Sequence, residues 1–293
     1  MFVASPLLGA GWGQFTWHHF QYEALTGARA AHGVFNHAHN LALQLMAETG
    51  LSGAIVVVGA ALAWLWDRRG TAFDLEHWWI LSVLSVLAIH SLLEMPLWYS
   101  NFLGIAGVLL GAGAEQYLRS RAGRAARFAV AAIVAVGCLN LAWVLPAYQN
   151  FERLLFDRPK RVAAVPDVQA VTGEVLKVHR DPILTNYVEV AVSPGITLSE
   201  EQLHDKIELN SRVMRFSPGD LEVYRQALLL ALAGEREAAL KLLEWASRVY
   251  PERLPAMVET ITTLARLHPD KFNPLLELAS GKTETLRVPR AVP

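Results

Sequence analysis

The chain has a single cysteine, nearly balanced charges and no N-terminal segment of the signal-peptide type. These properties exclude, in turn, an internal disulfide, a polybasic nucleic-acid-binding signature and a signal peptide at residues 1–15. Cys138 is the single cysteine among 293 residues, so no intramolecular disulfide can form. The 26 lysines and arginines balance 27 acidic residues, which excludes the polybasic signature of a nucleic-acid-binding protein. Residues 1–15 lack the basic segment and the small-residue cleavage site of a signal peptide.

Apolar residues are plentiful and unevenly distributed. Hydrophobic residues make up 53% of the chain and the mean hydropathy is +0.27, which favours a membrane protein over a soluble domain. The sequence predicts an all-α protein in three parts. These are an outward loop with glycine and histidine motifs (1–40), a transmembrane region of about four helices (41–146) and a helical domain outside the membrane (147–293).

Arginines orient the four predicted spans, which run over 51–66, 78–93, 97–114 and 128–145. The loops after the first and third spans hold Arg68, Arg69, Arg119, Arg121, Arg124 and Arg127. The positive-inside rule places these two loops in the cytoplasm. We therefore expect the residues before Leu51, the turn 94–96 and everything after Pro146 to face outward, which in a bacterium is the periplasm.

The outward C-terminal part contains a helical hairpin. Residues 222–251 read as two helices separated by a break at Ala233–Gly234, and apolar residues recur at helical spacing in the second. This pattern resembles one tetratricopeptide-like hairpin. Fewer than three such repeats are visible, so we expect no long solenoid.

The segment 37–54 gathers polar groups beside a predicted span, where they are costly to keep and usually functional. His39 and Asn40 precede an apolar helix that carries Glu48 and is interrupted by Gly50 and Gly53. Asn40 fits two roles, an N-cap and a substrate contact, which are compatible. A helix broken at membrane depth is tolerated where it is buried in protein or lines a water-filled cavity.

Other motifs lie at the same predicted outer face. His90 and Glu94 are four residues apart, which predicts one helix face and either a structural pair or a role in a catalytic site. Gly9, Gly11 and Gly13 predict a close approach of backbone to another group. Zinc is one interpretation of the histidines before Asn40, but they show no recognised ligand spacing, and we expect no metal.

Together these motifs resemble the bacterial O-antigen ligase superfamily. The segment 5–15 is followed by His39-Asn40, nine residues, Gly50, two residues and Gly53, which is the superfamily's spacing; Ala54 stands where Gly, Thr or Tyr is usual. Residues 90–104 and the helical C-terminal part are similar to the PglL-type pilin O-oligosaccharyltransferases. The chain therefore resembles the C-terminal portion of such a transferase.

The resemblance implies a multi-pass glycosyltransferase of the bacterial inner membrane that uses no cofactor. The family moves an oligosaccharide from undecaprenyl diphosphate to an acceptor, here a Ser or Thr hydroxyl of pilin or another periplasmic protein. By resemblance, His39 is the general base or a donor to the diphosphate, and Asn40 positions His39 or the substrate. The candidate substrate-binding residues are Arg29, His37, Glu48, His90 and Glu94.

Two other hypotheses stay open. A lipopolysaccharide O-antigen ligase or polymerase would use the same chemistry on a different acceptor. A non-catalytic membrane anchor would instead use its tetratricopeptide-like domain to bind a periplasmic protein. The family's upstream spans are not in this sequence, and Arg29 is the only arginine before Leu51. We therefore expect an N-terminally truncated chain that is inactive on its own.

Overall fold

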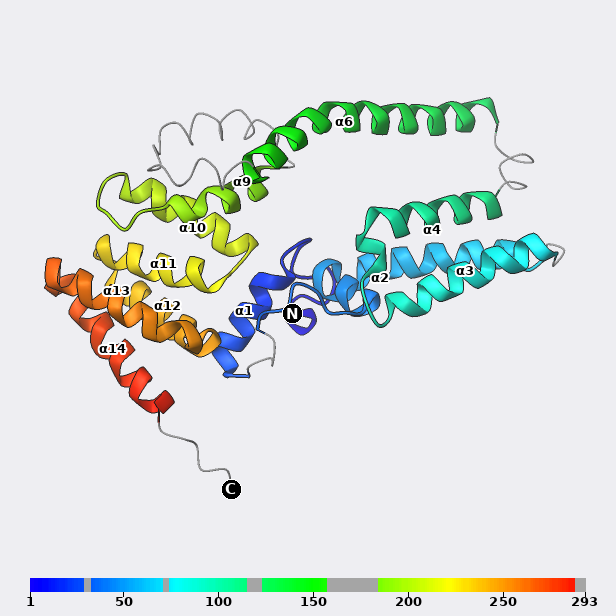
Figure 1. Ribbon diagram of the computed structural model, residues 1–293. Coiled ribbons are helices and arrows are strands. Elements are labelled where there is room, and N and C mark those ends of the chain that lie inside the picture. The colour runs from blue at the N-terminus through cyan, green and yellow to red at the C-terminus, as the bar shows by residue number, and fades with distance from the viewer. Residues whose placement is uncertain (29–32, 71–73, 115–122, 157–183, 288–293) are drawn as a thin grey trace, which may run out of the picture. The chain divides into compact units, whose positions relative to one another are not determined.

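All regular structure in the protein is helical wherever the chain is described (Figure 1). The computed structural model describes residues 1–28, 33–70, 74–114, 123–156 and 184–287. Eleven α-helices lie in these residues, which confirms the predicted all-α class. The chain divides into two compact units. Unit 1 comprises Met1–Phe15 and Asn36–Leu141, and unit 2 comprises Thr16–Phe35 and Ala142–Pro293. The three-part division at residues 40 and 146 stays a prediction.

Side-chain caps begin the first two long helices of unit 1. The Oδ1 atom of Asn40 accepts a hydrogen bond from the backbone N–H of Leu43 (3.0 Å) and starts α2 (Leu41–Arg68). Asp74 caps α3 (Leu75–Ser91) in the same way, at 2.9 Å from the N–H of His77. Such caps satisfy backbone donors that have no partner within the helix.

The remaining helix of this group, α4 (Ser100–Gly113), follows the short 3₁₀ turn η2 (Pro96–Trp98) and packs against α3. The indole N–H of Trp64 in α2 donates to the carbonyl of Leu110 in α4 at 3.1 Å. A Cβ at Gly113 would lie 2.6 Å from the Trp64 ring, so glycine allows this close packing.

Two helices are long and apolar enough to cross a membrane. One is α2, and the other is the Arg127–Arg153 stretch of α6 (Arg124–Phe156), in which no part of the most apolar window is buried. The helix α4 is apolar but shorter. Two of the four predicted spans thus meet the criteria of length and composition in the described residues, and the count of four stays a prediction.

Unit 2 contains a stack of short helices. They are α9 (Thr185–Val192), α10 (Leu203–Phe216), α11 (Asp220–Leu232), α12 (Arg236–Val249), α13 (Leu254–Leu267) and α14 (Pro269–Arg287). Neighbours in sequence pair, α10 with α11, α11 with α12, and α13 with α14. The predicted helix–break–helix at 222–251 is confirmed, with Gly234 in the left-handed region (φ 83°) between α11 and α12. The tetratricopeptide assignment stays a prediction.

The helix α1 (Phe15–Thr26) belongs, after its first residue, to the core of unit 2, although the sequence predicted a loop there. Phe20 and Ala24 are fully buried. The Phe20 ring stacks on Tyr250 with 6.2 Å between ring centroids, and the guanidinium of Arg248 donates to the carbonyl of Ala24 at 3.0 Å. The bond from Arg248 satisfies a carbonyl that has no partner in its own helix.

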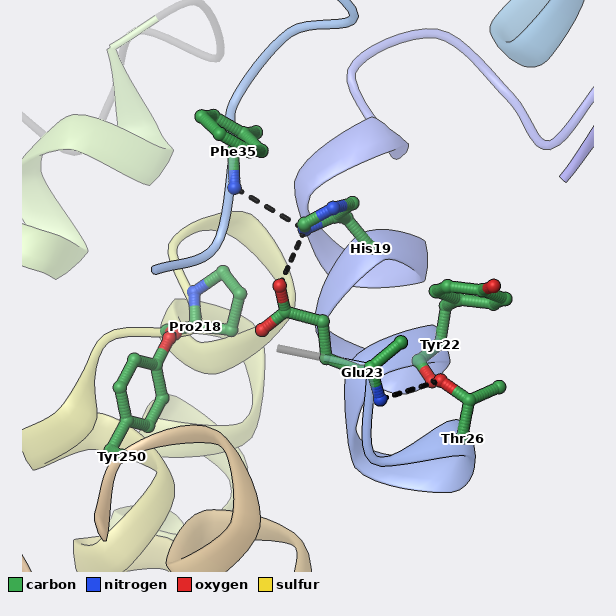
Figure 2. Close-up of polar contacts among 8 residues, drawn as sticks. His19, Tyr22, Glu23, Thr26, Phe35, Pro218 and Tyr250 are labelled. Atoms are coloured by element: carbon green, nitrogen blue, oxygen red, sulfur yellow. Dashed lines mark hydrogen bonds and ion pairs between the residues drawn. The ribbon is translucent and has the colours of Figure 1, made fainter. Parts of the chain in front are cut away.

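Polar groups on α1 are also held in place (Figure 2). The Nδ1 atom of His19 accepts from the backbone N–H of Phe35 at 3.3 Å and lies 3.9 Å from a carboxylate oxygen of Glu23. With its side chain only 18% exposed, His19 does not simply face water as a loop residue would. The Tyr250 hydroxyl donates to the carbonyl of Pro218 in the same close-up.

Candidate functional site

The site is organised by a break in α2 at Gly50. Its backbone angles (φ 66°, ψ −164°) lie in a region that is essentially restricted to glycine. The break leaves the carbonyls of Ala47 and Glu48 without partners from the following turn. It likewise leaves the N–H groups of Leu51 and Ser52 without carbonyls from the preceding one.

The glycine-rich segment before α1 supplies the missing partners. Four hydrogen bonds run from Ala10 N to Ala47 O, from Gly11 N to Glu48 O, from Leu51 N to Pro6 O and from Ser52 N to Leu7 O, at 2.8, 2.9, 2.8 and 3.3 Å. N–H groups of the loop bond the free carbonyls before the break in α2, and carbonyls of the loop accept from the free N–H groups after it. The loop therefore replaces the bonds that the break removes, a condition for breaking a helix at membrane depth. We call this pairing of 6–11 with 47–52 the glycine junction.

Two glycines allow the backbones of the junction to touch. A Cβ at Gly9 would lie 2.3 Å from the Glu48 carbonyl carbon, and a Cβ at Gly50 would lie 2.4 Å from the carbonyl carbon of Leu7. At Gly53 a Cβ would meet the Thr49 hydroxyl oxygen at 2.1 Å. The motif glycines thus shape the backbone around the site, and the close approach predicted for the first of them is present.

His39 and Glu94 form the polar centre of the site. The Nδ1 atom of His39 lies 2.8 Å from the Oε2 atom of Glu94, and both side chains are about half exposed. His39 has a left-handed backbone (φ 49°), which is uncommon outside glycine. With Nδ1 donating to the carboxylate, Nε2 is the ring nitrogen that can accept a proton.

Asn40 joins the start of α2 to the end of α3. While its Oδ1 caps α2, its Nδ2 donates to the carbonyl of Leu92 at 2.9 Å. Leu92 is the C-cap residue of α3 and stands two residues before Glu94. The Asn40 side chain therefore fixes the two chain segments that carry His39 and Glu94. The predicted N-cap is confirmed; a substrate contact by Asn40 stays a prediction.

Glu94 lies beyond the helix that carries His90, and its carboxylate pairs with His39. The helix α3 ends at Ser91, and Glu94 lies in the turn that follows, although its backbone N–H still donates to the His90 carbonyl at 2.8 Å. The Glu94 carboxylate instead pairs with His39, 55 residues earlier in the chain. The His90 ring meets Phe102 edge-on, with 6.3 Å between ring centroids.

Two further candidate substrate-binding residues, Glu48 and His37, also lie in unit 1. Glu48 is buried, 3% exposed, and its Oε1 accepts from the backbone N–H of Phe15 at 3.3 Å. Burial lowers the pKa of His37 below its ordinary value of 6.5, with His39 adding to the effect and Glu48 opposing it. His37 is therefore neutral at neutral pH. Its buried Nδ1 atom has no hydrogen-bond partner among the residues that the structure describes.

The structure thus brings His39, Asn40 and Glu94 together and leaves His90 out. Arg29 lies outside the described residues. In the described ranges, no group of three His, Cys, Asp or Glu side chains is arranged to hold a metal ion. What remains is an imidazole held by a carboxylate at one end of a helical bundle, an arrangement that can take up and release a proton.

Sequence reasoning missed the His39–Glu94 pair and a contact of two tryptophans beside it. Trp12 of the loop stacks on Trp98 of η2, with 5.5 Å between ring centroids and 15° between planes. Neither pairing leaves a local signal, since the partners are far apart in sequence. Only the occurrence of both motifs at one predicted membrane face pointed in this direction.

Comparison with known proteins gives one match. A family profile described as "virulence factor membrane-bound polymerase, C-terminal" matches residues 78–264, more than half of the chain. The matched range includes Glu94 and Trp98. It begins after His39 and the glycine junction, which therefore lie outside it. No curated protein and no solved structure matches the chain.

Proposed function

The chain belongs to the virulence factor membrane-bound polymerase family, whose C-terminal part it matches, and from this we propose that it transfers a lipid-linked oligosaccharide to an acceptor hydroxyl. Membership supports a membrane-bound, glycan-transferring polymerase or ligase. The observation that carries the chemistry is the 2.8 Å contact between His39 Nδ1 and Glu94 Oε2. We further propose undecaprenyl diphosphate as the carrier and a Ser or Thr of pilin, or of another periplasmic protein, as the acceptor.

The proposed reaction is a direct displacement at the anomeric carbon. The acceptor oxygen forms the new bond to that carbon, and the bond from the carbon to the diphosphate oxygen breaks, so the electron pair leaves with the carrier. The acceptor proton passes to Nε2 of His39. Glu94 holds the imidazole in the required tautomer and stabilises the imidazolium that forms, as the carboxylate does in a catalytic triad.

The neighbours of the pair have supporting roles in this proposal. Asn40 positions His39 relative to Glu94 through its bonds to α2 and α3. His37 and Glu48 contribute to the electrostatics of the substrate site, and His37 does so as a neutral group. A diphosphate leaving group needs positive charge beside it, which is the role proposed for Arg29.

The identity of the acceptor distinguishes the proposed protein glycosylation from a second candidate function. The family description names a polymerase, which favours a sugar hydroxyl as an alternative acceptor. A polymerase or lipopolysaccharide ligase would use the same pair on the same kind of donor. We propose that the helical unit 2 presents the protein acceptor on the periplasmic side, a role that neither of these alternatives needs.

The test is His39→Ala introduced at the chromosomal gene of a bacterial strain that carries it. Loss of a general base lowers transfer by about 10²- to 10⁴-fold. The measurement is the glycosylated fraction of pilin by intact-protein mass spectrometry, together with the glycan chain-length profile. His204→Ala, at an exposed histidine of α10, is the matched control and retains transfer.

The outcomes separate the candidates. Loss of pilin glycosylation with an unchanged glycan profile supports the proposal. Loss of long glycan chains with pilin unaffected identifies a polymerase or ligase. Unchanged transfer in His39→Ala overturns catalysis by this site and leaves the non-catalytic anchor.

A further inference from the structure

Trp12 exposes a large aromatic surface and contacts Trp98, which follows Glu94 by four residues. Its side chain is 66% exposed although one ring face stacks on Trp98. His37, two residues before His39, packs edge-on against Trp98 with 5.8 Å between ring centroids and 63° between planes. Trp98 therefore contacts both other rings, Trp12 face to face and His37 edge-on. We call Trp12 and Trp98 the tryptophan platform.

The backbone around Trp12 is built to hold its ring outward. Gly11 and Gly13 on either side have positive φ values of 105° and 73°, and Gly11 is bonded to α2 through the glycine junction. A Cβ at Gly13 would meet nothing within 4 Å, so this glycine serves the turn rather than packing. Such a turn fixes the position of an exposed ring at low entropic cost.

Trp98 is fixed in a similar way on the other segment of the site. It ends the 3₁₀ turn that starts at Pro96, and its N–H donates to the carbonyl of Met95 at 3.1 Å. Trp98 follows Glu94 by four residues, and His37 precedes His39 by two. Each of the three rings is thus carried by a segment that also supplies the catalytic pair or the glycine junction.

We propose that the outer face of Trp12, backed by Trp98, binds one sugar ring of the lipid-linked glycan. The inference rests on the proposed function, since it adds a donor subsite to it. A pyranose presents several C–H groups on one face and its hydroxyls around the edge. The C–H face carries slight positive charge and suits the negative face of an indole, whose quadrupole favours such contacts. The Trp12 indole, supported by the nearly parallel ring of Trp98, offers a flat surface that matches a sugar ring better than an irregular peptide.

The kinetic test uses the whole protein in lipid nanodiscs, with donor and acceptor concentrations varied separately. Trp12→Leu removes the aromatic face and raises the KM for the lipid-linked donor by about 3- to 10-fold, the range that a single aromatic contact supports. The KM for the acceptor and kcat stay within about twofold, since the contact is the same in ground and transition states. Trp12→Phe keeps a smaller aromatic face and has an intermediate donor KM. Trp79→Leu, at a 55% exposed tryptophan of α3, is the matched control and leaves the donor KM unchanged.

A binding test separates this inference from the proposed reaction. Free oligosaccharide released from the carrier is titrated into the His39→Ala variant while tryptophan fluorescence is followed. The fluorescence change is expected in His39→Ala and is lost when Trp12→Leu is added. This measurement needs no transfer, so it reports on the tryptophan platform even if His39 is not the base.

Three results would overturn the subsite. The first is an unchanged donor KM in Trp12→Leu, which makes Trp12 a membrane-interface residue only. The second is a raised acceptor KM with an unchanged donor KM, which assigns the surface to the acceptor. The third is an equal rise of donor KM in Trp79→Leu. Hydrogen exchange at Leu51 and Ser52 confirms in each variant that the glycine junction is intact.

Discussion

The site region of unit 1 and the core of unit 2 hold their residues in place by different means. Around the site, backbone meets backbone: four hydrogen bonds and two glycines fix the loop 6–11 against α2. In unit 2, large side chains fill a common core, with Tyr224, Phe20 and Phe272 fully buried. The contact around the site thus requires glycines, which have no side chain, whereas the core of unit 2 requires large side chains that fill space.

This difference indicates what each region is suited to do. A catalytic group must be held within a fraction of an ångström, and contact between backbones leaves less freedom than contact between side chains. Because the backbone contacts need no side chains to cover the site, His39 and Glu94 stay about half exposed and accessible to a substrate. A side-chain core tolerates small adjustments and supplies most of the stability of its unit. Substitutions should therefore have distinct consequences in the two regions.

Gly50→Ala should have the largest effect. Alanine adds strain in a region of φ and ψ open essentially to glycine, and its Cβ would overlap the Leu7 backbone, so we expect a cost above ~4 kcal/mol and loss of transfer. Gly13→Ala is the control, because its positive φ costs about 1 kcal/mol without any overlap. Hydrogen exchange at Leu51 and Ser52 measures both variants. Equal exchange rates would contradict the glycine junction.

Phe20→Ala should destabilise unit 2 while the glycine junction stays intact. Removing a fully buried phenylalanine costs about 3–4 kcal/mol. Tyr22→Ala, at a 57% exposed position of the same helix, should cost less than ~1 kcal/mol. The measurement is hydrogen exchange in α11 and α12 of the whole protein. Unchanged exchange there would show that α1 is not part of this core.

Asn40→Ala should have an intermediate effect on the site region. It removes an N-cap and the bond to the Leu92 carbonyl, at a cost of about 1–2 kcal/mol. Asn40→Asp keeps the cap but places a carboxylate oxygen against the Leu92 carbonyl in place of the donor, so this repulsion should cost about 1–2 kcal/mol in stability. Both should lower transfer if Asn40 fixes His39 relative to Glu94. Wild-type transfer with Asp would assign Asn40 to capping alone.

The smallest effect concerns Tyr250 and appears as a dependence on pH. Burial, with a contribution from Glu23, raises the pKa of Tyr250 above its ordinary value of 10.0. The folded state therefore holds the proton more tightly, and the stability of unit 2 is fully present below pH 10 and declines as the pH rises further. Tyr250→Phe should weaken this decline and cost about 1 kcal/mol at pH 7, because the bond to the Pro218 carbonyl is lost. Thermal unfolding followed at pH 7 and pH 11 measures both effects, and an equal alkaline loss in the variant would contradict them.

The sequence predicted those features that depend on neighbouring residues. The cap at Asn40, the interruption of α2 by Gly50 and the hairpin break near Gly234 each follow from local residue types and are present. The partner of Glu94 could not be predicted in this way. The spacing of four pointed to His90, but α3 ends at Ser91 and the carboxylate pairs with His39.

The helix α1 was missed for a related reason. Its apolar residues follow no clear helical stripe, and glycines flank it at Gly13 and Gly27, so the segment reads as a loop. Phe20 is buried by Trp245 and Tyr250, which lie more than 200 residues later in the chain. Tertiary packing of this kind overrides local propensity.

The place of α1 in the core of unit 2 also constrains how the chain is threaded through a bilayer. Phe20 and Tyr250 share one folded core, so their segments occupy the same aqueous compartment. The chain that leaves this core after Val34 and returns to it at Leu198 must therefore cross the bilayer an even number of times. Crossing by α2 and α6 alone meets this parity, as does crossing by α2, α3, α4 and α6. A topology with three crossings between the two segments is excluded.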